Sequence, residues 1–284
     1  MENGPGSANY VETNIGHNTG AAPWILLRGL TRESRHWGSF VGQLEAALPG
    51  SRVIALDLPG NGQLHRQRSP MHVHAMVESC RAQLKARNIT APYRLLAMSL
   101  GAMVAVAWSS AYPHEIATQV LIITSLRPFS SFYQRLRPAN YGALLKLAVL
   151  GASPEAWERT IFRLTSNPAS RAAIDAVLPL WLAWRQGNPV SRANALRQLV
   201  AAARFRAPKT APAAATLMLA SAQDRLVSVA CSKALAPIGH AICASTPAPG
   251  TTCRWTTGPG LRPRCVTGWR SWLAFNLTPA LETV

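Results

Sequence analysis

The stretch of this sequence with the clearest chemical potential is Ala97-Met98-Ser99-Leu100-Gly101. It joins an apolar run directly to a helix-forming run, so Ser99 stands on the sharp turn between a strand and a helix. Such a turn exposes the serine hydroxyl as a nucleophile and directs the backbone N–H of Leu100 toward the oxygen of an incoming carbonyl group. The alternative is a serine that is merely buried in a close contact between the helix and the strand.

Two further segments contain groups that would complete this chemistry. Leu30 follows an apolar run and Gly29, so its N–H can turn inward as a second donor to an oxyanion. Asp224 follows another apolar run, where a carboxylate can orient a histidine base. An Asp just past a strand is often only a turn or helix-capping residue. The candidate site residues are therefore Ser99, Asp224, Leu30 and Leu100.

These residues require a scaffold of alternating strands and helices. Helix-forming segments at about 37–48, 71–87 and 100–111 separate short apolar runs, and Pro113 ends the last of them. The pattern predicts an α/β fold with a mostly parallel sheet flanked by helices. The predicted strands are Trp24–Leu27, Val53–Leu56, Arg94–Ala97, Val120–Ile123 and Leu217–Ala220.

The alternation stops where a long helical stretch begins, at about Arg127. That stretch includes a helix start in which Ser153 is the N-cap and Pro154 the first helical residue. A later helix is predicted to bury one face, made of Ile174, Val177, Leu178 and Trp181. We therefore predict a helical cap over residues 127–206, a core over 22–126 and 207–284, and a flexible N-terminal segment over 1–21.

Over residues 22–236 the chain resembles the α/β-hydrolase fold superfamily. The matching motifs occur in the family's order: LLRG, DLPGNG, AMSLG and LASAQDRLV. The resemblance implies Ser99 as nucleophile, Asp224 as the acid of a catalytic triad, and a helical cap over the pocket. Two residues depart from the family pattern: Arg28 stands where many members have His, which predicts a cation near the pocket mouth, and Ala97 replaces the first Gly of the serine motif.

The histidine of the triad is missing from its expected place. The family order Ser, Asp, His places it about 25–30 residues after Asp224. His240, the only histidine in that direction, comes 16 residues after it (240 − 224 = 16). Beyond residue 236 the chain holds three of its five cysteines and a single acid, Glu282, and no clear apolar strand is expected there. The triad is therefore predicted to be incomplete, with His240 at best a substitute base.

We interpret residues 237–284 as a segment translated in a shifted reading frame. Read one nucleotide earlier, the codons of Thr246 to Thr257 can encode His-Pro-Ser-Ala-Gly-His-Asp-Leu-Pro-Leu-Asp-Asp. Gly-His-Asp-Leu-Pro resembles the catalytic histidine loop of the superfamily, and its histidine replaces Thr251, 27 residues after Asp224 (251 − 224 = 27). The segment is therefore expected to pack irregularly.

The leading functional hypothesis is a serine hydrolase that cleaves a small or medium acyl ester through an acyl-enzyme and is impaired in this chain. Acyl transfer, peroxidation and C–C bond hydrolysis would use the same residues. A dehalogenase is disfavoured, because the turn between strand and helix holds a serine, Ser99, rather than an aspartate. The alternative is an inactive homologue that at most binds a small ligand under the cap.

Composition narrows the remaining possibilities. The net charge of +17 comes mostly from single, scattered arginines, so a nucleic-acid partner is not expected. The longest apolar run, residues 95–108, is too short to span a bilayer, and the polar N-terminus does not resemble a secretory signal, which favours the cytoplasm. Five cysteines without CxxC spacing support neither a disulfide framework nor a zinc site, and no cofactor is expected.

Overall fold

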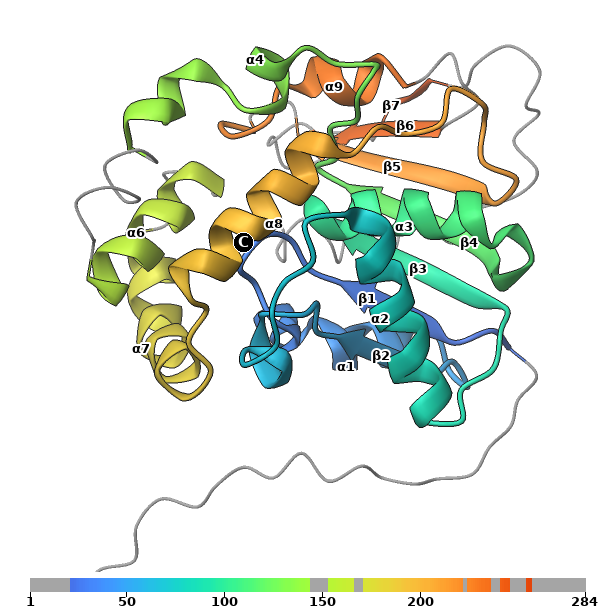
Figure 1. The fold of residues 1–284 in the computed structure, drawn as a ribbon, viewed down its shortest axis with the longest axis horizontal. Helices are drawn as coiled ribbons and strands as arrows, with labels where there is room; N and C mark the ends of the chain where they lie inside the picture. The colour runs from blue at the N-terminus through green and yellow to red at the C-terminus, as the bar shows by residue number, and fades with distance from the viewer. Residues whose placement is uncertain are drawn as a thin grey trace, which may run out of the picture.

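A computed structural model describes residues 21–143, 153–165, 171–221, 224–235, 241–245 and 254–256. Its centre is a seven-stranded sheet in the order β2-β1-β3-β4-β5-β6-β7 (Figure 1). Adjacent strands from β2 to β6 run parallel, and β7 is antiparallel to β6. The strands are β1 (Trp24–Leu27), β2 (Val53–Leu56), β3 (Tyr93–Met98), β4 (Ile116–Ile122), β5 (Ala215–Ser221), β6 (Ala241–Ser245) and β7 (Arg254–Thr256).

The mostly parallel sheet flanked by helices confirms the predicted fold class. All five predicted strands are present, and β1 and β2 have the predicted bounds. Each residue of β1 is buried, because helices cover both faces of the sheet. Trp24 and Leu26 pack with Leu44 of α1 on one face, whereas Ile25 and Leu27 belong to the cluster formed with α2 and α3 on the other.

The expectation of no strand beyond residue 236 was wrong. β6 pairs with β5 from Leu217↔Ala241 to Ser221↔Ser245, and β7 pairs with β6. The edge of β5 offers backbone N–H and C=O groups to any extended segment, so pairing there does not require a strong apolar pattern. Most of residues 237–284, whose irregular packing was predicted, lie outside the described residues.

The helices form the two outer layers and a helical segment between β4 and β5. None of those in the described residues is long and apolar enough to cross a membrane. Short 3₁₀ turns are η1 (Ser34–Trp37), η2 (Gly62–Leu64), η3 (Pro113–Glu115) and η4 (Pro138–Asn140). The helices are α1 (Phe40–Ala47), α2 (Val73–Ala86), α3 (Leu100–Ala111), α4 (Phe132–Arg135), α6 (Pro154–Thr165), α7 (Arg171–Gly187), α8 (Arg192–Arg204) and α9 (Val229–Lys233).

The helical segment between β4 and β5 leaves and rejoins the core at adjacent points. Arg127 and Arg206 form a parallel bridge, and the N–H of Ala207 donates to the carbonyl of Arg127 at 2.7 Å. Helices α6 and α7 lie away from the sheet, and α8 runs back toward it (Figure 1). Helices α6 and α7 pack together through a separate small apolar cluster, which consists of Phe162, Ile174, Leu178 and Trp181.

Glu115, directly before β4, is a half-buried polar anchor on the amino-terminal side of the sheet. Its carboxylate accepts hydrogen bonds from Arg81 Nη2 at 2.7 Å and from the buried Trp108 Nε1 at 2.7 Å. Burial raises the pKa of Glu115, but the hydrogen bonds from Arg81 and Trp108 outweigh it and leave this pKa below its usual value. A carboxyl group whose folded-state pKa is lowered stabilises the fold above its unfolded pKa and loses that contribution as pH falls.

We expect Glu115→Ala to lower the free energy of unfolding by about 1–3 kcal/mol, because Arg81 and the indole of Trp108 lose their acceptor. The difference from the parent chain should shrink below about pH 4, where the parent carboxyl group is protonated. Urea unfolding at several pH values measures both effects. The exposed Glu45→Ala in α1 is the control and should change stability by less than about 0.5 kcal/mol. An equal effect of the two substitutions contradicts the assignment.

Candidate active site

Ser99 lies on the turn between β3 and α3, as the sequence predicts. Its backbone has φ 53° and ψ −114°, a conformation that costs a non-glycine residue about 1–3 kcal/mol. Two hydrogen bonds hold it there: Ser99 N–H donates to the carbonyl of Ile122 at 3.0 Å, and Met103 N–H donates to the carbonyl of Ser99 at 3.2 Å. The strained turn is therefore fixed by the end of β4 and by the first turn of α3.

Glycines allow the segments around Ser99 to approach closely. A Cβ atom on Gly101 would lie 2.5 Å from the carbonyl oxygen of Leu27, so α3 packs directly on the backbone of β1. A Cβ on Gly29 would lie 3.1 Å from the Cβ of Ser99 and 3.6 Å from its Oγ. The loop after β1 thus passes beside the hydroxyl of Ser99.

The two predicted oxyanion donors, Leu100 and Leu30, occupy different surroundings. Leu100 is the first residue of α3, where backbone N–H groups have no partner inside the helix. Leu30 follows Gly29 in the loop after β1, and its neighbour Thr31 has φ 58°. The N–H of Thr31 donates to Gln198 Oε1 of α8 at 2.9 Å. This contact fixes the backbone of the loop immediately after Leu30.

Gln198 is a site residue that the sequence analysis missed. It is fully buried, and its Nε2 donates to Asn61 Oδ1 at 2.7 Å and to Ser69 Oγ at 3.1 Å. Four residues earlier on the same helix, Asn194 Oδ1 accepts from the N–H of Ser69 at 2.9 Å. Amides four residues apart on one face of α8 were the available signal, because polar side chains at that spacing share a helix face.

Asp224 follows β5, and its carboxylate is engaged by its own loop. Asp224 Oδ1 accepts from the N–H groups of Leu226 at 2.7 Å and Val227 at 2.8 Å. Burial raises the pKa of Asp224, although these two hydrogen bonds and the nearby Arg137 oppose the shift. The contacts are those of a turn residue, and the second carboxylate oxygen, Oδ2, takes no part in them.

Ser99 and Asp224 lie at the same edge of the sheet, because each follows the carboxyl end of a parallel strand. β4 separates β3 from β5, so the two strand ends are about 10 Å apart. Ser99 is not among the hydrogen-bond partners of the Asp224 carboxylate in the described residues, so a third side chain must bridge the two if they act together.

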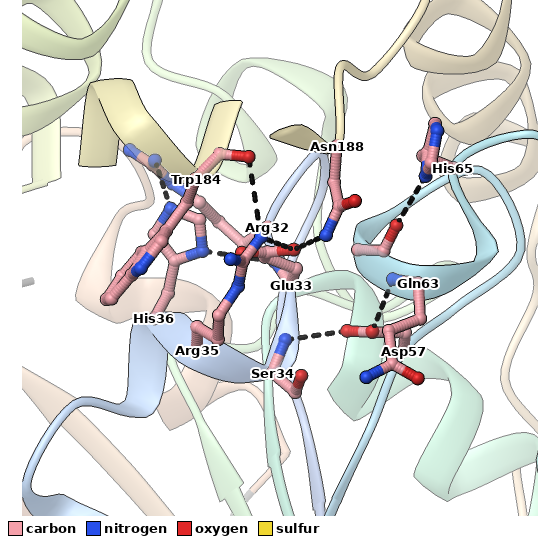
Figure 2. A network of polar contacts seen from close by, with 11 residues as sticks. Arg32, Glu33, Ser34, Arg35, His36, Asp57, Gln63, His65, Trp184 and Asn188 are labelled. Atoms are coloured by element: carbon pink, nitrogen blue, oxygen red, sulfur yellow. Dashed lines mark hydrogen bonds and ion pairs between the residues drawn. The ribbon is translucent and has the colours of Figure 1, made fainter. Parts of the chain in front are cut away.

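His36, a half-buried histidine of the loop after β1, has both ring nitrogens engaged. Its Nδ1 accepts from the N–H of Glu33 at 3.2 Å, and its Nε2 faces Arg32 Nη1 at 3.1 Å (Figure 2). Burial, followed by the charges of Arg32 and Arg28, lowers the pKa of His36 well below its usual value. This histidine is therefore committed to the loop after β1 and is not placed to serve Ser99.

His240 and Thr251 lie outside the described residues. The residue after His240, Ala241, begins β6 and pairs with Leu217 near the amino end of β5. Thr251 comes six residues after Ser245, the last residue of β6 (251 − 245 = 6).

Charged residues join α6 and α7 to the loop after β1. Glu158 of α6 pairs with Arg32 at 2.5 Å and with Arg185 of α7 at 3.0 Å, and its side chain is 4% exposed. Arg35 pairs with Glu33 and also donates to the carbonyl of Trp184 at 3.4 Å (Figure 2). Helices α6 and α7 are therefore tied to the same loop that contains Leu30.

Two further residues noted in the sequence, Asp57 and Arg28, also lie near this loop. Asp57 ties the loops after β1 and β2 together, because its carboxylate accepts from Ser34 N at 2.6 Å and Gln63 N at 2.9 Å (Figure 2). Arg28, expected near the pocket mouth, is instead only 3% exposed and lies over the ring of Trp37. That expectation was wrong because the alternation of β1 turns the side chain of Arg28 inward, to the face of Leu26.

The chain belongs to the alpha/beta hydrolase fold family, whose family model matches residues 23–186. No curated protein matches it. Solved structures with the same fold include an esterase from Rhodococcus (19% identity, 93% of this chain and 92% of that chain covered, TM-score 0.60). A second is 2-hydroxy-6-oxo-6-phenylhexa-2,4-dienoate hydrolase from Rhodococcus (16% identity, 79% of this chain and 83% of that chain covered, TM-score 0.62). A third is an N-acyl homoserine lactone degrading enzyme (16% identity, 80% of this chain and 85% of that chain covered, TM-score 0.58). At these identities the likeness is one of fold.

Proposed function

We propose that this protein is a serine hydrolase that cleaves a small or medium acyl ester through an acyl-enzyme, and that this chain is impaired in that reaction. The observation that carries the proposal is the strained backbone of Ser99 at the carboxyl edge of the sheet, beside Gly29. Strain of this kind is retained at functional sites, and no packing role of the hydroxyl requires it.

In the proposed reaction a histidine removes the proton of Ser99 while Oγ attacks the carbonyl carbon of the ester. The N–H groups of Leu30 and Leu100 stabilise the negative charge on the carbonyl oxygen. The alkoxy group leaves with the proton returned by the histidine, and water then releases the acid from the acyl-enzyme by the same steps. Asp224, through the carboxylate oxygen outside its own turn, orients the histidine.

The missing component in this chain is the histidine. We propose that the restored reading frame supplies it in place of Thr251, in the loop after β6. Loss of the base from a Ser-His-Asp enzyme costs about 10⁶ in turnover, so this chain retains little activity. An esterase and a lactone-degrading enzyme among the structural neighbours support an ester substrate, whereas the dienoate hydrolase keeps C–C cleavage as an alternative.

The second candidate is an inactive homologue that at most binds a small ligand under the cap. The engagement of both nitrogens of His36 favours it, because this half-buried histidine is not free to act as the base. A ligand that binds without turnover by either this chain or a frame-restored chain would identify this function.

The nucleophile is tested by Ser99→Ala in a frame-restored chain. We expect the substitution to abolish covalent labelling by a fluorophosphonate and to lower the rate of p-nitrophenyl butyrate hydrolysis by about 10⁴-fold or more. Peptide mass spectrometry should locate the label on Ser99. The matched control is Ser109→Ala, which removes a hydroxyl from the same helix; Ser109 is 1% exposed and its Oγ has no hydrogen-bond partner among the described residues.

Labelling of another residue, or a rate that survives Ser99→Ala, contradicts the proposal. The control variant should keep both the label and the rate. Loss of activity in both variants indicates general damage to α3 and would not support a special role for Ser99.

A further inference from the structure

Arg28 and Trp37 form a buried pair that the proposed reaction does not use. Arg28 directly follows β1, and its Cζ lies 4.9 Å from the centre of the Trp37 ring. Arg28 is 3% exposed and Trp37 is 6% exposed, so both side chains are effectively removed from solvent. A cation over an aromatic ring is stabilised by the ring face, but that contact satisfies no N–H group of the guanidinium.

Three N–H donors of this pair have no hydrogen-bond partner in the described part of the chain: Arg28 Nε, Arg28 Nη1 and Trp37 Nε1. No ion pair of Arg28 with an acid is found there either, and the charged group that acts on it is the like-charged Arg32. Burial, and then Arg32, lower the pKa of Arg28 to about 9, so it still bears a proton at neutral pH. An unpaired buried charge is costly, and an anion relieves that cost.

The donor set is suited to a carboxylate. Guanidinium and indole N–H groups only donate, and a planar guanidinium matches the two oxygens of a carboxylate. The neighbouring cation, Arg32, does not compete with Arg28 for such a carboxylate, because Arg32 is already paired with Glu158. The pair is therefore an anion-binding site built from two side chains of the core.

The site is close to the candidate nucleophile. Gly29, the residue after Arg28, is the one whose added Cβ would lie 3.1 Å from the Cβ of Ser99. The carbonyl of Arg28 lies 2.7 Å from the position of a Cβ on Gly101, so its backbone packs against the first turn of α3. The backbone of Arg28 and Gly29 therefore lies beside Ser99 and the start of α3.

We propose that Arg28 and Trp37 bind a carboxylate of the substrate, so that the preferred substrates are short acyl esters that also carry a free carboxylate. This inference rests on the proposed hydrolase function for its ester part. The carboxylate site itself is inferred from the buried, unpaired N–H groups of Arg28 and Trp37, so a binding measurement tests it without any hydrolysis.

Binding is measured by calorimetry on the Ser99→Ala variant, with monoethyl glutarate and diethyl glutarate as a matched pair of probes. The two differ by one free carboxylate. We expect the monoester to bind about 10- to 100-fold more tightly, the range for hydrogen bonds to a charged group. Adding Arg28→Gln should reduce this preference to about one. Adding Arg87→Gln, at an exposed arginine directly after α2, should leave it unchanged.

Trp37→Phe provides a second variant that keeps the ring and removes one N–H, so the preference should fall only partly. It keeps the test decisive if Arg28→Gln fails to fold. Equal binding of the two probes, or a preference that survives both Arg28→Gln and Trp37→Phe, overturns the proposal.

The same titration on a frame-restored chain distinguishes a substrate carboxylate from one supplied by the protein. The restored frame encodes aspartate in place of Thr252, Thr256 and Thr257, and any of these could pair with Arg28. A preference for the monoester in both chains supports the substrate site, and its disappearance from the restored chain overturns it. Failure of the hydrolase proposal appears separately, as fluorophosphonate labelling that does not depend on Ser99.

Discussion

A chain whose reading frame is restored from about residue 236 should hydrolyse p-nitrophenyl butyrate at least about 10⁴-fold faster than this chain. The physical reason is that a serine hydroxyl is a poor nucleophile until a base removes its proton. Ser99 and Asp224 follow the carboxyl ends of β3 and β5, two strands that are about 10 Å apart across β4. An imidazole between them supplies the proton transfer that neither can perform alone.

The rate constants of the two purified chains measure this effect, and sequencing the gene across codons 230–260 locates the inserted or missing base. The control is a restored chain in which the codon of Thr251 still encodes threonine, which should remain as slow as this chain. Adding His240→Ala to this chain should not change its residual rate. An uninterrupted reading frame through residues 246–257, together with full activity of this chain, contradicts the frame-shift interpretation.

The largest expected loss of stability follows from Gly101→Ala. The added Cβ would lie 2.5 Å from the carbonyl oxygen of Leu27 and 2.7 Å from that of Arg28. These are backbone atoms at the end of β1, which is paired with β2 on one side and β3 on the other, so they cannot move without disturbing both ladders. We expect a loss of about 3 kcal/mol or more, at the upper end of the cost of overpacking.

Thermal unfolding measures the loss, which corresponds to a decrease in Tm of about 6–12 °C for a chain of this size. Gly42→Ala in α1 is the control: nothing lies within 4 Å of its added Cβ, so it should raise stability by about 0.5–1 kcal/mol. A Gly101→Ala variant as stable as the parent would show that α3 does not pack on β1 as closely as described. Because the displaced helix begins next to Ser99, the restored chain should also lose activity.

The apolar runs of the sequence were sufficient to predict the first five strands of the central sheet. Trp24–Leu27 and Val53–Leu56 are continuous apolar stretches between turn residues, and they form β1 and β2 with those bounds. The small residues around Ser99 similarly predicted the sharp turn, because a helix that starts immediately after a strand must pack against the neighbouring strand. These features depend on local sequence, so they can be read without knowing which segments meet.

Contacts between distant segments were decided only by the tertiary structure. Gln198 comes 167 residues after Thr31, and nothing in the helical period of α8 shows that its amide accepts that N–H. β6 was missed because its pairing relies on the exposed backbone edge of β5, and backbone hydrogen bonds leave little trace in side-chain patterns. Arg28 was assigned to a pocket mouth from its residue type, whereas the alternation of β1 and the position of Trp37 bury it. Local sequence determined which elements form, and the packing of those elements determined which polar groups found partners, because hydrogen bonds and burial depend on segments that are far apart in the chain.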